Sequence, residues 1–166
     1  MTESINSLNA DLFSRREREA PDPKTARKKA MDFLARREYG QAELAGRLVA
    51  AGFTAAIAQD AVTQLTADGL QDDGRYAASF VNARVSRGSG PLRIASALRE
   101  RGLSDSIIDS ALQDADVDWY AEARAAREKK FGLGAVGTYA DKAKQMRFLQ
   151  YRGFDMEQIR HAMGEG

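Results

Sequence analysis

Apolar residues return along this chain at the spacing of amphipathic helices. Ile57, Ala61 and Leu65, for example, stand four positions apart, so they would share one face of a helix. No segment sustains the strict alternation of apolar and polar residues that is typical of a half-buried strand. The pattern therefore predicts an all-α protein.

One short pattern occurs three times. A leucine is followed four positions later by a glycine, then by an apolar residue, and then by Thr, Ser or Asp. The leucines are Leu48, Leu98 and Leu149, and the glycines are Gly52, Gly102 and Gly153. The glycines lie 50 and then 51 positions apart, which indicates one supersecondary unit copied along the chain. We expect the leucines in helical cores and the glycines in the left-handed conformation that closes a helix.

The repeat predicts an elongated, curved array of three three-helix units. We expect a flexible N-terminal tail over residues 1–21 and repeats over residues 22–70, 71–116 and 117–166. Asp22 and Pro23 have the residue types of an N-cap and a first helical position, and Pro91 after Gly90 begins a helix in the second repeat. Stacked repeats form extended surfaces rather than catalytic pockets.

The amino-acid composition excludes several kinds of protein and site. The chain has 25 Lys and Arg against 24 Asp and Glu, a formal net charge of +1, so affinity for nucleic acid would need charge gathered on one face. There is no cysteine, which excludes disulfides, thiolate metal sites and cysteine nucleophiles. No apolar run approaches the roughly 18 residues of a membrane span, and the N-terminus lacks the apolar core of a signal peptide. We therefore expect a cytoplasmic protein.

Residues that could carry catalysis are isolated. His161 is the only histidine, and we expect it to face solvent near a helix C-terminus. The serines have no histidine near them in sequence, and the paired acids stand where helix capping explains them. The sequence thus predicts no enzyme activity, no metal site, no cofactor and no small-molecule substrate.

A glycine-rich segment in the third repeat imitates a nucleotide-binding motif. Gly132-x-Gly134-x-x-Gly137 matches the dinucleotide fingerprint as a string, but a helix precedes it and no βαβ unit surrounds it. We interpret it as a flexible joint that lets part of the third repeat swing.

Basic residues gather in the second and third repeats. The candidates for contact with a partner or DNA are Arg75, Arg84, Arg87, Arg93, Arg99, Arg101, Lys129, Lys130, Lys144, Arg147 and Arg152. Arg93 and Arg99 have no acid four positions away, so we expect no local ion pair to neutralise them. The bare backbone of Gly88 and Gly90 would let a phosphate approach closely. A solvated face without function is the alternative interpretation of such charges.

A helix-turn-helix that reads DNA sequence is disfavoured. The last helix of the second repeat carries Asp105, Asp109 and Asp114, and the last helix of the first repeat, residues 55–68, has no Lys or Arg. Such helices would not enter a major groove. The positive charge on the other helices suits contact with a nucleic-acid backbone or an acidic protein.

Several stretches together resemble a known family. The second repeat carries Gly69-Leu-Gln-Asp72-Asp73-x-Arg75-Tyr76-Ala77, Phe80-Val81-x-x-Arg84 and Gly88-x-Gly90-Pro91-x-Arg93-Ile94. The third carries Lys130-Phe131-Gly132 and Arg147-Phe148-Leu149-x-x-Arg152-Gly153-Phe154. From about Thr25 to Met163 the chain resembles the RecX family, bacterial regulators of the recombinase RecA.

The resemblance implies tandem three-helix repeats that bind RecA in the groove of the RecA–single-stranded DNA filament. It implies inhibition of strand exchange and of ATP hydrolysis by RecA, in recombination, DNA repair and the SOS response, without catalysis by this chain. The family's conserved positions correspond here to Arg75, Arg84, Gly90, Pro91, Arg93 and Arg152.

Two functional hypotheses follow. The first is a filament modulator, which binds RecA filaments well above DNA alone. The second is a stand-alone helical module that binds nucleic acid directly, weakly and without sequence specificity. A passive helical scaffold for other proteins is a third, which would leave recombinase activity untouched.

Overall fold

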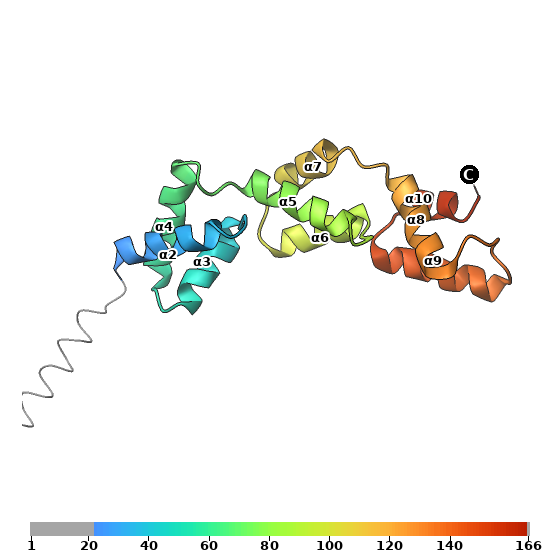
Figure 1. The fold of residues 1–166 in the computed structure, drawn as a ribbon, viewed down its shortest axis with the longest axis horizontal. Coiled ribbons are helices and arrows are strands. Elements are labelled where there is room, and N and C mark those ends of the chain that lie inside the picture. The colour runs from blue at the N-terminus through green and yellow to red at the C-terminus, as the bar shows by residue number, and fades with distance from the viewer. Residues whose placement is uncertain (1–21, 166) are drawn as a thin grey trace, which may run out of the picture. The chain divides into compact units, whose positions relative to one another are not determined.

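The computed structural model describes residues 22–165, so the predicted tail over residues 1–21 lies outside the described residues. All regular structure in residues 22–165 is helical, which confirms the all-α prediction for this part. The chain divides into two compact units, unit 1 up to Gln71 and unit 2 from Asp72 onwards. Each is described below by itself, with the helix labels of Figure 1.

Unit 1 is a three-helix cluster of α2 (Pro23–Leu34), α3 (Gln41–Ala50) and α4 (Ala55–Ala67). Its core contains Leu44, Leu48 and Leu65, each 0% exposed. The α3–α4 turn follows the repeated pattern, because Gly52 has φ +103° and the Thr54 hydroxyl accepts a hydrogen bond from the Ile57 backbone N–H at 3.3 Å. These local signals set the helix ends.

The first half of unit 2 contains α5 (Asp73–Val85), α6 (Pro91–Glu100) and α7 (Asp105–Asp114). Asp72 caps α5 by accepting from the Arg75 backbone N–H at 2.8 Å, and Ser104 caps α7 in the same way. Gly102 has φ +82° before that cap. Leu98 is 0% exposed and packs with Val81, Ile94 and Ile108.

The second half of unit 2 contains α8 (Trp119–Phe131), α9 (Tyr139–Arg152) and α10 (Met156–Ala162). Leu149 and Ile159 are fully buried in its core. Capping boxes begin α9 at Thr138 and α10 at Asp155. The backbone N–H of Thr138 donates to the Asp141 carboxylate and holds the pKa of that carboxyl below its usual range, since hydrogen bonding favours the ionised form.

One tryptophan side chain packs against the cores of both halves of unit 2. Trp119, the only tryptophan in the sequence, packs against the core of α5–α7 and against the core of α8–α10. Its indole therefore reports on the packing of both halves at once.

A buried arginine of α8 contacts the glycine-rich loop between α8 and α9, whose flexibility stays a prediction. Arg127 is only 8% exposed. Its Nε donates to Gln145 Oε1 at 2.8 Å and its Nη2 donates to the Gly134 carbonyl at 2.9 Å. A buried guanidinium is stable only when its donors are used, so this contact joins the loop to α8 and α9.

No helix within residues 22–165 combines the length and the apolar character that crossing a bilayer requires.

Candidate interaction surface

The candidate surface is built around a crossing of two chain segments in unit 2. The Gly90 backbone N–H donates to the Arg152 carbonyl at 2.7 Å, and the Leu92 N–H donates to the Gly153 carbonyl at 3.0 Å. The donors belong to the N-terminus of α6 and the acceptors to the C-terminus of α9, which are the ends where helices leave backbone groups without partners. Two backbone N–H groups at the start of α6 thus pair with two carbonyls at the end of α9. The positive end of the α6 dipole therefore meets the negative end of the α9 dipole.

The crossing requires glycine on both segments. A Cβ on Gly90 would lie 2.4 Å from the Gly153 carbonyl carbon and oxygen, although φ at Gly90 is an ordinary −84°. A Cβ on Gly153 would lie 2.3 Å from Arg93 Cβ, and Gly153 also has φ +96°. Gly153 has the left-handed conformation predicted for it, and both glycines let two backbones approach closely. The expectation that the Gly90 backbone lies open to a phosphate is wrong, because Gly90 is buried and its N–H already donates to the Arg152 carbonyl.

Two of the predicted partner-facing arginines also hold this crossing. Arg93 Nη1 donates to the Tyr151 carbonyl at 3.0 Å, and its guanidinium lies over the Tyr151 ring at 4.6 Å. Arg152 Nη1 donates to the Arg87 carbonyl at 3.1 Å, and its guanidinium lies over Phe148 at 5.1 Å. Both arginines therefore contribute to structure as well as to surface charge.

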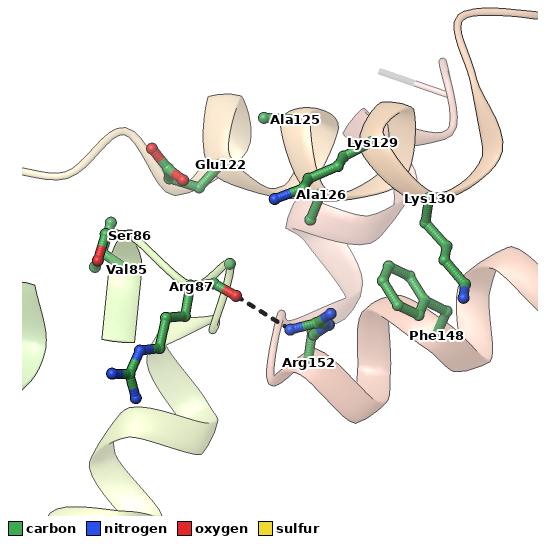
Figure 2. Close-up of a pocket in the computed structure, with 11 residues that line it drawn as sticks. Val85, Ser86, Arg87, Glu122, Ala125, Ala126, Lys129, Lys130, Phe148 and Arg152 are labelled. Carbon is green, nitrogen blue, oxygen red and sulfur yellow. Dashed lines mark hydrogen bonds between the residues drawn. The ribbon is translucent and has the colours of Figure 1, made fainter. Parts of the chain in front are cut away.

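A groove of about 390 Å³ opens beside the crossing, between the C-terminal end of α5, α8 and α9 (Figure 2). We call it the interrepeat groove. Its cations come from three elements and its apolar lining comes mainly from α8 and α9. The lining residues are Val85, Ser86, Arg87, Gly88, Glu122, Ala125, Ala126, Lys129, Lys130, Phe148 and Arg152.

A second groove of about 340 Å³ lies on α5 and α6, and we call it the α5–α6 groove. Arg84, Arg93 and Arg101 line it together with Glu100. The guanidiniums of Arg84 and Arg101 lie 4.8 and 4.9 Å from the Phe80 ring centroid. One aromatic ring thus orients two cations at the groove.

The structure sorts the predicted basic residues into groups. The interrepeat groove gathers Arg87, Lys129, Lys130 and Arg152, and the α5–α6 groove gathers Arg84, Arg93 and Arg101. Arg75, Arg99, Lys144 and Arg147 line neither groove.

The expectation of no local ion pair at Arg99 is wrong. Arg99 Nε lies 2.6 Å from Asp105 Oδ1, because the α6–α7 turn brings a residue six positions later alongside it. Both side chains are mostly exposed, so the pair contributes little stability, but it does neutralise Arg99.

Some lining residues were not predicted from the sequence. Phe148 stood in a quoted motif without an assigned role, and Glu122, Ala125 and Ala126 were not singled out. Helical spacing could have indicated the three α8 residues. Glu122, Ala125 and Ala126 stand seven, four and three positions before Lys129 and therefore lie on the same face of α8.

His161 is less solvent-facing than expected. It is half-buried, its ring lies edge-on to Tyr120 at 5.1 Å, and its Nε2 lies 2.7 Å from Arg124 Nη2. In residues 22–165 no three His, Cys, Asp or Glu side chains come together as a metal site would require.

These features define an all-α repeat protein with two grooves lined by basic residues. Three RecX family models match the chain in order: the first three-helix domain at residues 26–65, the second at 72–112 and the third at 116–163. The chain belongs to the RecX family. The three three-helix units predicted from the repeat are confirmed by these matches.

Similar proteins agree with this assignment. A regulatory protein RecX from Halorhodospira halophila is 46% identical over 133 residues, which cover 80% of this chain and 83% of that protein. A regulatory protein RecX from Chromohalobacter salexigens is 40% identical, over 84% of this chain and 91% of that protein. The crystal structure of RecX from Lactobacillus salivarius shares the fold, with a TM-score of 0.73 at 20% identity, over 86% of this chain and 95% of that one.

Proposed function

We propose that this chain binds the RecA recombinase and the RecA–single-stranded DNA filament, and that it inhibits strand exchange and ATP hydrolysis by RecA. The proposal places the protein in the cytoplasm, in the control of recombination, DNA repair and the SOS response. Membership of the RecX family over residues 26–163 carries it, together with relatives named as regulatory proteins.

The basic grooves suit such a role. A filament of RecA on DNA repeats its subunits, so a chain with several modest contact sites gains affinity by engaging neighbouring subunits at once. The seven cations at the two grooves come from α5, α6, α8 and α9 and the loops between them. Contacts of this kind block subunit exchange or ligand access without new chemistry.

The test is the ATPase activity of RecA on single-stranded DNA, with increasing amounts of this chain. We expect inhibition, and shorter filaments in electron micrographs of the same samples. An ATPase rate that stays unchanged while the chain is shown to be folded would contradict the proposal.

A charge variant tests whether the exposed face of α9 takes part. Lys144 and Arg147 are exposed one turn apart on α9. Changing both to Gln should raise the concentration needed for half-inhibition by at least about threefold, because interfacial charges speed association and orient the partner. Lys24→Gln with Lys28→Gln on α2, also exposed, is the matched control and should change it by less than about twofold. Equal effects of the two pairs would remove any special role for this face.

Direct binding to nucleic acid is the second candidate function, favoured by the concentration of cations at the two grooves. It predicts that the logarithm of the binding constant falls with the logarithm of salt concentration by about 0.9 per phosphate contacted on duplex DNA. A nearly flat dependence would exclude it.

A further inference from the structure

We propose that the interrepeat groove is the docking site for a short acidic segment of a protein partner. Carboxylates of that segment would meet the basic rim, and one of its aliphatic or aromatic side chains would lie against Phe148 and the α8 alanines. The inference rests on the proposed function, because it names the kind of segment through which a regulated protein would be held.

The rim of the groove has a large excess of positive charge. Four cations line it, Arg87, Lys129, Lys130 and Arg152, against the single carboxylate of Glu122. Among residues 22–165, none of these four cations forms a salt bridge. Lys129 and Lys130 are exposed on the last turn of α8. The charges of these two lysines are thus available to a partner of opposite sign.

Part of the lining of the same groove is apolar. Val85, Ala125, Ala126 and Phe148 belong to it, and Figure 2 shows Phe148 and Arg152 on α9 facing the α8 side of the groove. An apolar lining with a few placed polar groups is typical of a site that anchors one side chain and orients it by charge. The groove therefore fits an amphipathic segment better than a purely charged one.

The aromatic ring of the groove is poorly placed to stack a nucleic-acid base. Base stacking uses an open aromatic face. The Arg152 guanidinium lies over Phe148 at 5.1 Å, and Phe131 packs against the same ring with centroids 5.3 Å apart at an interplanar angle of 89°. What Phe148 still offers is apolar contact for a side chain.

Glu122 also favours a peptide over a phosphate backbone. Its carboxylate lines the groove, where it repels phosphates and carboxylates alike. A peptide backbone, however, also brings N–H groups whose hydrogen bonds this carboxylate can accept, and a phosphodiester backbone has none. The volume of about 390 Å³ lies near the lower end of the range for ligand pockets, about 300–1,000 Å³. It suits a few side chains rather than a long strand.

The test uses the full chain and fluorescence anisotropy. The probe is a short labelled peptide of Glu and Asp with a central Leu-Phe pair, beside a matched peptide in which Gln and Asn replace the acids. We expect saturable binding of the acidic peptide and at least about tenfold weaker binding of the neutral one, since a tenfold change corresponds to about 1.4 kcal/mol.

Two groove variants should each weaken binding of the acidic peptide by at least about tenfold. Lys129→Gln with Lys130→Gln removes two rim charges. Ala125→Glu adds a carboxylate at an exposed groove position, and the new Glu stands four residues before Lys129, a pairing that supports the helix. That variant therefore keeps the fold while it removes groove charge, which far-UV circular dichroism checks. Lys24→Gln with Lys28→Gln is the matched control and should leave peptide affinity within about twofold.

The inference is overturned if the groove variants bind the acidic peptide as well as the natural chain does, or if no saturable binding occurs up to about 1 mM peptide. It is also overturned if an oligothymidylate, but not the peptide, binds in a way that the groove variants weaken. If the peptide assay fails while the natural chain still binds RecA filaments, the docking site alone is wrong. If filament binding fails, the proposed function is wrong.

Discussion

Replacing Gly153 with alanine is expected to lower the free energy of unfolding of unit 2 by roughly 2–5 kcal/mol. Two costs combine. The new Cβ would lie 2.3 Å from Arg93 Cβ, and overpacking of this kind costs about 1–3 kcal/mol. The residue also holds φ +96°, and the left-handed region costs an L-residue about 1–2 kcal/mol. Urea unfolding followed by the fluorescence of Trp119, which touches both halves of unit 2, measures the effect.

Two neighbouring glycines separate these costs. Gly88 has φ +77°, but the nearest atom to its added Cβ is Arg152 Nη1 at 4.0 Å. Gly88→Ala should therefore lower the free energy of unfolding only by the conformational cost, about 1–2 kcal/mol. Gly90 has an ordinary φ of −84°, so Gly90→Ala should lose only the packing part, about 1–3 kcal/mol. If Gly153→Ala costs no more than Gly88→Ala, the α6–α9 crossing does not form as described.

Leu98→Ala is expected to destabilise unit 2 by roughly 2–5 kcal/mol, because it leaves a cavity in the core of α5–α7. Leu98 is 0% exposed and packs with Val81, Ile94 and Ile108. The same urea titration, read by Trp119 fluorescence, gives the change in free energy of unfolding.

Leu92→Ala is the matched control for that change. Leu92 lies on the same helix and is 57% exposed, so its truncation should alter stability by less than about 0.5 kcal/mol. Equal effects at positions 92 and 98 would contradict the repeat alignment, which places Leu98 with Leu48 and Leu149 as core residues.

The helices could be predicted from sequence because their signals are local. The capping side chains Thr54, Ser104 and Asp155 act within three residues of themselves, and apolar spacing within one helix defines its buried face. The same locality explains why the repeat predicted three-helix units. Helix ends and buried faces that depend on residues four or five positions apart therefore appear in the structure as the sequence predicts them.

The surface could be predicted only in part, because its contacts join distant residues. The cations were visible in sequence, but the partner of Arg93 is a carbonyl 58 positions away, and that of Arg152 is 65 positions away. Sequence spacing also gave no sign that Arg127 would contact the glycine-rich loop through Gly134. Gly90 and Gly153 were each noticed, but nothing along the chain indicates that the two backbones touch.

The most direct measurement is a pair of titrations of the full chain, one against RecA filaments on single-stranded DNA and one against the same DNA without RecA. We expect affinity for the filament to exceed affinity for the bare DNA by at least about tenfold, or about 1.4 kcal/mol. Equal affinities would show a nucleic-acid binder that does not recognise the recombinase.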